Sequence, residues 1–209
     1  MRLLALAFTV LTSTSMFAAD LSGKYSVKGS NPGGSAYTGS LTLVRNGESY
    51  ALTWDSGGIS TGIGIAVGDA LAVAVGDGCA VAGYQVNAEG GLDGKWIGPQ
   101  GGVVASEQAV PGVGTTQGLA GDYVVKGTNP DGKPYKGGLG IVVNEGVLRF
   151  SWRTGSNFEG YGIQQEGRIA AVWGNAGCGV VLYRVTADGV LSGIWKYPDS
   201  TIGNETATR

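Results

Sequence analysis

The chain has 209 residues, of which 14 are Lys or Arg, 16 are Asp or Glu, 40 are Gly and none is His. The formal net charge of −2, without clusters of Lys and Arg, argues against a nucleic-acid partner, because such partners are bound by basic surfaces. The absence of His limits acid–base chemistry to carboxylates, Lys and Tyr. Two Cys far apart in the chain also lack the usual ligand spacing of a zinc site, so we expect no metal and no cofactor.

Residues 1–19 have the pattern of a secretory signal peptide. Arg2 supplies a short positive region, residues 3–10 are apolar, and small residues end at Ala19. The apolar run is too short for a permanent membrane anchor, and no later run is longer. We expect an exported protein, periplasmic or extracellular, that does not insert into a membrane.

The remainder of the chain is an internal duplication. The segment Leu21–Gly39 returns as Leu119–Gly137 at an offset of 98, which becomes 99 from the Cys79/Cys178 pair onward. A period of this length indicates a duplicated domain rather than a solenoid. We predict a first domain at 20–109, a linker at 110–118 and a second domain at 119–209.

Each repeat reads as a series of short strands. The first repeat is expected to hold strands near 22–30, 36–45, 49–55, 60–67, 70–76, 79–87, 91–98 and 102–108, and the second repeat follows at the same offsets. Antiparallel strands with one apolar face close most simply into an up-and-down barrel, which removes the sheet edges. The predicted fold is therefore all-β, with two tandem, homologous barrels of about eight strands each and no substantial helix after the signal peptide. A β-sandwich in each repeat is the alternative.

The expected inner face of these strands is aromatic and apolar in both repeats. Trp54 and Trp152 occupy equivalent inward positions, as do Trp96 and Trp195. An eight-stranded barrel is just wide enough for side chains to fill. We therefore expect little free cavity inside either barrel.

Cys79 and Cys178 are equivalent residues, one in each repeat. In an exported protein two cysteines suggest a disulfide, but these two can meet only if the domains pack about a pseudo-twofold axis. Alternation places Cys178 on an outward apolar strip with Val180 and Leu182, which is the pattern of a domain interface. A Cys79–Cys178 disulfide, reduced or partner-linked thiols, and buried inert thiols all remain open.

The motif G-x-Y-x-V-x-G-x-N-P-x-G-x-x-Y-x-G runs from Gly23 to Gly39 and again from Gly121 to Gly137, and each copy later carries G-x-L-x-G-x-W. Nearly the whole chain after the signal peptide thus resembles an uncharacterised family of bacterial secreted tandem β-repeat proteins, some of which are labelled fibronectin-binding. The Gly-x-Trp strands more distantly resemble those of avidin-like and lipocalin-like barrels. That resemblance implies a barrel, but no biotin-site residue can be assigned.

The middle of the second repeat is more polar than the same stretch of the first. Aromatic residues beside Arg are typical of protein-contact surfaces. The candidate binding residues are Arg153, Phe158, Glu159, Tyr161 and Arg168. Ordinary sequence drift on a solvated face is the alternative.

Nothing in the sequence predicts catalysis. Gly58–Gly62 matches the nucleophile pattern G-x-S-x-G, but it lies in an expected hairpin and the chain has no His to act as base. A glycosidase would need two facing carboxylates, and we expect no carboxylate pair that recurs in both repeats. We expect a non-catalytic binding or adhesion module for a protein or other macromolecule outside the cytoplasm. A small-ligand-binding barrel and a secreted enzyme inhibitor are the alternatives.

Overall fold

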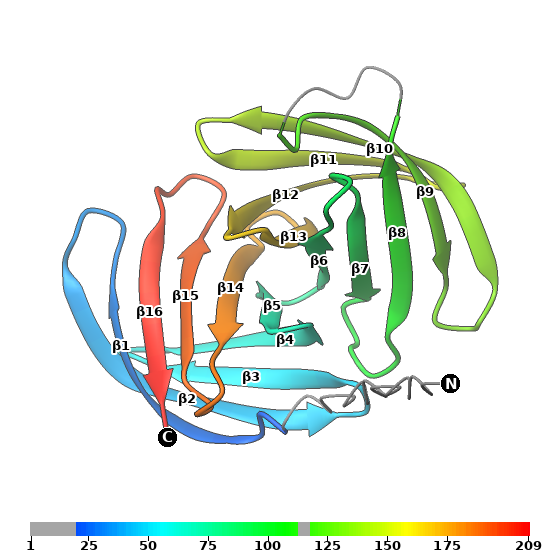
Figure 1. Cartoon of the computed structure of the whole chain (residues 1–209). Coiled ribbons are helices and arrows are strands. Elements are labelled where there is room, and N and C mark those ends of the chain that lie inside the picture. The colour runs from blue at the N-terminus through cyan, green and yellow to red at the C-terminus, as the bar shows by residue number, and fades with distance from the viewer. Residues whose placement is uncertain (1–19, 113–117) are drawn as a thin grey trace, which may run out of the picture.

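The computed structural model describes residues 20–112 and 118–209, so the signal peptide predicted at 1–19 lies outside the described residues. Within the described residues the chain forms antiparallel strands and no helix (Figure 1). The strands are β1 (Gly23–Ser30), β2 (Ala36–Asn46), β3 (Ser49–Asp55), β4 (Ile59–Val67), β5 (Ala70–Val75), β6 (Cys79–Val86), β7 (Leu92–Ile97), β8 (Ala105–Pro111), β9 (Gly121–Thr128), β10 (Pro134–Asn144), β11 (Val147–Arg153), β12 (Asn157–Gln165), β13 (Arg168–Gly174), β14 (Gly179–Val185), β15 (Leu191–Lys196) and β16 (Gly203–Thr208).

These strands close into two eight-stranded barrels, which confirms the predicted fold class. The first barrel has the order β1-β16-β15-β14-β5-β4-β3-β2, and the second has the order β10-β11-β12-β13-β6-β7-β8-β9. The strand expected near 102–108 is displaced to Ala105–Pro111. Its predicted start falls in a turn, where Gly101 and Gly102 both have positive φ.

Each barrel is built from both repeats. The first barrel combines β1–β5 of the first repeat with β14–β16 of the second, and the second barrel combines β6–β8 with β9–β13. Figure 1 shows this exchange by colour, because the barrel that holds the blue and cyan strands also holds the orange and red ones. The domain boundaries predicted at 20–109 and 119–209 therefore do not coincide with the barrels.

The predicted linker at 110–118 does not join two domains. Residues 110 and 111 belong to β8, which pairs with β9 inside the second barrel, and residues 113–117 lie outside the described residues. The backbone N–H of Gly112 continues this pairing with a hydrogen bond of 2.7 Å to the carbonyl of Asp122. The segment thus connects neighbouring strands of one barrel.

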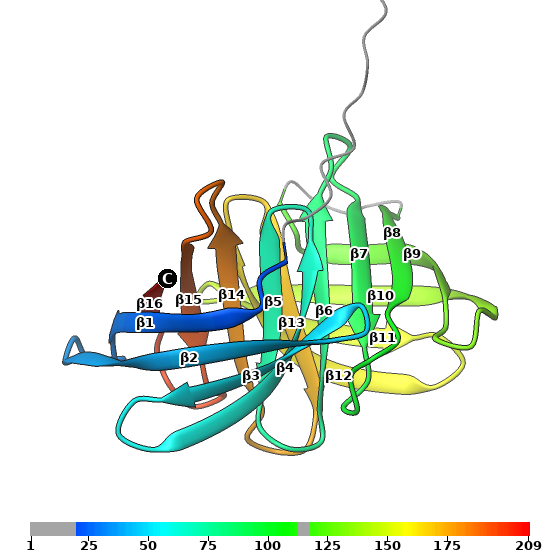
Figure 2. The same ribbon diagram turned by 90° about the horizontal axis from the view of Figure 1, so that it is seen from below.

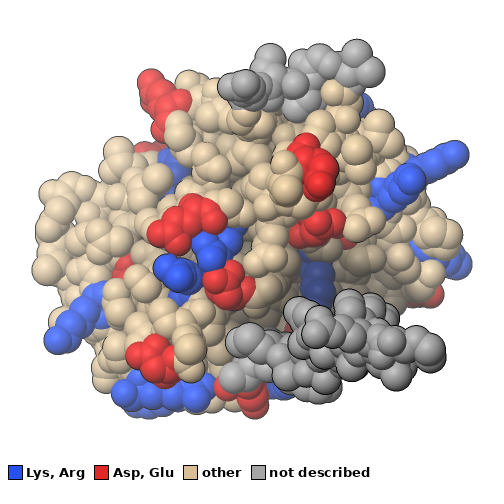
Figure 3. All heavy atoms as spheres, in the orientation of Figure 1, with Lys and Arg blue, Asp and Glu red and all other residues tan. Residues whose placement is uncertain are grey.

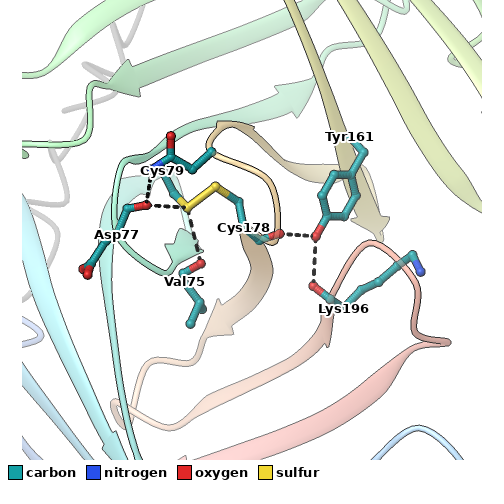
Figure 4. Close-up of a disulfide and its surroundings, with 7 residues drawn as sticks. Val75, Asp77, Cys79, Tyr161, Cys178 and Lys196 are labelled. Carbon is teal, nitrogen blue, oxygen red and sulfur yellow. Dashed lines mark hydrogen bonds between the residues drawn. A yellow bond between two sulfur atoms is a disulfide. The ribbon is translucent and has the colours of Figure 1, made fainter.

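The chain passes between the barrels twice, and a disulfide joins the two crossings. Residues 76–78 lead from β5 to β6, and residues 175–178 lead from β13 back to β14. Cys79 and Cys178, at the ends of these crossings, are disulfide-bonded with their Cα atoms 5.7 Å apart (Figure 4). Of the three alternatives that the sequence left open for these cysteines, the structure has the disulfide. Asn175 Nδ2 also donates to the carbonyl of Asp77 at 3.1 Å, which adds a second tie between the crossings.

Three apolar clusters stabilise the molecule. One lies inside each barrel, and a third lies between the barrels, where β4, β5, β6, β12, β13 and β14 pack against one another (Figure 2). Val180 and Leu182, on the predicted outward strip beside Cys178, belong to this third cluster and are buried. The apolar outer face is therefore a barrel–barrel interface. Burying a side chain such as Leu182 there contributes about 1.5–3 kcal/mol to its stability.

Candidate functional site

Each barrel contains a cavity at the end of the molecule where the crossings lie. The cavity of the second barrel has a volume of about 550 Å³, whereas that of the first has about 210 Å³. Loops β7–β8, β9–β10 and β11–β12 surround the larger one, which we call the mouth cavity. The expectation that side chains would leave little free space is thus wrong for the second barrel.

The mouth cavity has a buried carboxylate, Glu107, which is 3 % exposed. Glu107 Oε1 accepts hydrogen bonds from Tyr84 Oη at 2.6 Å and from Trp152 Nε1 at 3.2 Å. Its Oε2 accepts one from Tyr135 Oη at 2.7 Å, and Trp96 Nε1 donates to that phenol at 2.9 Å. Burial and then the neighbouring carboxylate raise the pKa of Tyr84 well above its ordinary value, so the phenol keeps its proton and remains a donor.

Bare backbone lets one of these rings approach the carboxylate. Gly127 lies under the ring of Tyr135, and a Cβ on this glycine would collide with the phenol carbon and oxygen. Gly127 belongs to the motif that is repeated in both halves of the chain. The motif therefore has a glycine at this position so that an aromatic ring can pack closely against the backbone, and not because of a turn.

The first barrel repeats this arrangement around Glu205, which is 5 % exposed. Its Oε1 accepts hydrogen bonds from Tyr183 Oη and from Trp54 Nε1, the latter at 3.1 Å, and its Oε2 accepts one from Tyr37 Oη at 2.8 Å. Trp195 differs from its counterpart, because its indole N–H is buried and has no partner within the described part of the chain. The carboxylate and its donors are thus common to both barrels, while the surroundings have diverged.

Several equivalent lining positions differ between the two cavities, and three of these differences change the aromatic lining. Phe158 and Trp173 of the second barrel replace Ser60 and Val75 of the first, which extends the aromatic wall. The position of Tyr197 in the first barrel is held in the second by a glycine that also lines its cavity. The ring of Tyr197 lies 6.0 Å from that of Trp195, across the mouth of the first barrel, so the smaller residue leaves the second mouth open.

Aromatic rings form most of the wall of the mouth cavity. The ring centroid of Trp173 lies 5.3 Å from that of Trp152, 6.2 Å from that of Trp96 and 6.5 Å from that of Phe158. Such ring pairs add about 0.5–1.5 kcal/mol beyond the area they bury, which fixes the wall before any ligand arrives. The full aromatic lining is Tyr84, Trp96, Tyr135, Trp152, Phe158 and Trp173.

Of the five binding residues predicted from sequence, Phe158 alone lines this cavity. Arg153 is exposed on the outside of the second barrel and pairs with Asp122 at 3.1 Å. Glu159 is also exposed and accepts a hydrogen bond of 2.8 Å from Ser151 Oγ. A binding role for these three residues stays a prediction.

Tyr161 and Arg168 lie between the barrels instead of on a free outer face. Tyr161 is 9 % exposed, and its phenol donates to the carbonyls of Cys178 at 2.5 Å and Lys196 at 3.3 Å (Figure 4). Arg168 makes a two-point ion pair with Asp69 at 2.5 and 2.6 Å, and hydrogen bonding to this guanidinium lowers the pKa of the Asp69 carboxyl. The five predicted residues therefore do not share one surface.

Sequence reasoning missed the two buried carboxylates. Glu107 and Glu205 occupy equivalent inward positions on the last strand of each repeat, between small residues two positions away on either side. Their offset is 98 rather than 99, because the second repeat is one residue shorter after Trp195. Aligning the last strands across that deletion would have found an acidic residue that recurs on the apolar face of both repeats.

The described residues contain no group of three or more His, Cys, Asp or Glu side chains able to hold a metal ion. They also contain no helix long and apolar enough to cross a membrane. No protein-family model matches this chain, and no curated protein matches it either. The resemblance to secreted repeat proteins stays a prediction, and the site must be interpreted from its own geometry.

Proposed function

We propose that this is an exported, non-catalytic protein that binds a small molecule in the mouth cavity of its second barrel. The observation that carries the proposal is a cavity of about 550 Å³ lined by aromatic rings over one buried carboxylate. Small-molecule sites typically measure about 300–1,000 Å³ and combine an apolar wall with a few fixed polar groups. The cavity of the first barrel, at about 210 Å³, falls below that range.

The arrangement of the site favours binding without rearrangement. The hydrogen bonds among Glu107, Tyr84, Tyr135 and Trp152 hold the floor of the cavity, and a closed barrel holds the strands that carry them. A ligand therefore does not have to order these side chains on binding. In a flexible site the free-energy cost of that ordering lowers the affinity.

The chemistry of the lining supports binding over catalysis. Burial and the Glu107 carboxylate raise the pKa of Tyr84 and of Tyr135, so neither phenol acts as a base near neutral pH. The Glu107 carboxylate already accepts three hydrogen bonds from protein donors. The disulfide between Cys79 and Cys178 supports export, because such bonds persist in oxidising compartments.

A macromolecular partner, the expectation drawn first from the sequence, has less support. Tyr161 and Arg168 make contacts between the barrels, so two of the five residues on which that expectation rested are not on a free surface. On the face shown in Figure 3, acidic and basic side chains are interspersed over a mostly uncharged surface. The exposed residues Arg153 and Glu159 remain available for such a partner as a hypothesis.

The test is a fragment screen by ligand-observed NMR against the wild type and against a Phe158→Ser/Trp173→Val double variant. This variant gives the second mouth the residues of the first at these two positions, and we expect it to lose the fragments that the wild type binds. A Ser60→Ala/Val75→Ala double variant alters the two equivalent positions of the first cavity and should keep them. Fragments that bind both double variants as well as the wild type would place binding outside the mouth cavity.

A further inference from the structure

The charge of the mouth cavity is not balanced by its own lining. Glu107 is the one acidic side chain among the described residues that line it, and no Lys or Arg lines it there. The first cavity differs, because Lys196 lines it together with Glu205. Duplication has therefore produced one cavity with a single negative charge and one cavity whose two charges are opposite.

Glu107 keeps the capacity to bind a ligand. A carboxylate offers about four acceptor positions, and Glu107 uses two on Oε1 and one on Oε2. The remaining position on Oε2 can accept a hydrogen bond from a ligand or hold a positive charge at contact distance. Burial strengthens such an interaction, because water screens it less than at the surface.

The donors at the floor of the cavity are already engaged. Tyr84, Tyr135 and Trp152 donate to Glu107, and Trp96 donates to Tyr135. These groups have no further strong N–H or O–H to offer an anion. They present ring faces, which carry negative electrostatic potential and attract cations.

We infer that the mouth cavity selects a compact organic cation, with its ammonium group near Glu107 and its carbon atoms among the rings of Trp96, Trp152 and Trp173. The inference rests on the proposed function and adds the charge of the ligand. A trimethylammonium or alkylammonium group combines the positive charge with the apolar surface that this lining matches.

The experiment compares choline with 3,3-dimethylbutan-1-ol, which has the same shape without the charge. Both are titrated into the full protein and followed by tryptophan fluorescence. We expect choline to bind on the order of tenfold more tightly than the alcohol, since a desolvated cation–π and carboxylate site contributes at least that factor. Glu107→Gln should remove about tenfold of the choline affinity and change that of the alcohol by less than about threefold. The matched Glu205→Gln variant should alter neither.

Phe158→Leu provides a second variant that does not depend on a buried position, because Phe158 is 43 % exposed. Leucine keeps the apolar contact but has no ring face, so choline should lose more affinity than the alcohol. Equal binding of choline and the alcohol, or unchanged choline binding in Glu107→Gln, would overturn the cation inference and leave the small-molecule site standing. Failure of choline to bind while neutral fragments bind would do the same. If no compound at all binds the mouth cavity, the proposed function fails as well.

Discussion

The disulfide that joins the two crossings makes a strong prediction about stability. Cys79 and Cys178 are 99 residues apart in sequence, and the loop they close contains every strand of the second barrel. The chain-entropy relation gives about 4.7 kcal/mol for a loop of roughly this length, while measured disulfides typically contribute about 2–4 kcal/mol. For a chain of this size each kcal/mol shifts Tm by about 2–4 °C, so a Cys79→Ala/Cys178→Ala variant should melt roughly 5–15 °C below the wild type.

The assay is a thermal melt of both proteins followed by circular dichroism, with and without reductant. Reductant should lower Tm of the wild type toward that of the double variant and leave the variant itself unchanged. A thiol titration of the denatured, unreduced wild type should find no free thiol, because the described residues contain no free cysteine. Two titratable thiols, or melts that coincide, would show that the disulfide does not stabilise the protein as expected.

Three further predictions concern the contact between the barrels. Tyr161→Phe removes the donor to the carbonyls of Cys178 and Lys196 and should cost about 1–3 kcal/mol in urea unfolding; an unchanged midpoint would contradict the buried contact. Asp69 has a pKa below 3.8 because Arg168 hydrogen-bonds its charged form. Its stabilising effect is therefore present above pH 3.8 and is lost as the pH falls through the lowered value. Asp69 is partly exposed, so Asp69→Asn should cost less than about 1 kcal/mol at neutral pH and nothing in strong acid, and an equal cost at both would exclude the ion pair. Finally, a protease site inserted between residues 112 and 118 should give two fragments that co-elute on gel filtration after reduction; separate elution would contradict the exchanged barrels.

The positions of the strands were predictable because their cause is local. Alternation in segments such as Ser49–Asp55 and its counterpart Val147–Arg153 fixes which side chains face inward, and glycines fix the turns between strands. The same alternation identified the outward strip that includes Val180 and Leu182, so the interface beside the disulfide could be anticipated. The alternation of apolar and polar residues thus predicted most of the strands and the side chains that face inward.

The exchange of strands between the repeats could not be predicted from that pattern. β6 and β14 are equivalent, so β5 meets similar side chains whether it pairs with β6 or with β14. Local propensity, alternation and the core composition are the same in both arrangements. The difference lies in the path of the crossings at residues 76–78 and 175–178, and a repeat in the sequence does not specify that path.

The candidate site was only partly predictable, for a related reason. Tyr161 was predicted to bind a partner, but the other barrel covers its face and its phenol makes a structural contact there. A charged residue on an apolar face needs buried hydrogen-bond partners. The donors to Glu107 are Tyr84, Tyr135 and Trp152, which come from strands far apart in sequence, so the sequence around Glu107 did not indicate them. Phe158 was included among the candidates because it is an aromatic residue in the more polar stretch of the second repeat.

The most direct test of the small-molecule site uses the five tryptophans of the chain, whose indole N–H groups give separate NMR signals. Trp96, Trp152 and Trp173 line the mouth cavity, while Trp54 and Trp195 line the cavity of the first barrel. After assignment by single Trp→Phe variants, a ligand from the fragment screen is titrated into the protein. We expect the signals of Trp96, Trp152 and Trp173 to move together while those of Trp54 and Trp195 stay in place. Movement confined to the first-barrel pair, or no movement of any of the five signals on binding, would contradict this expectation.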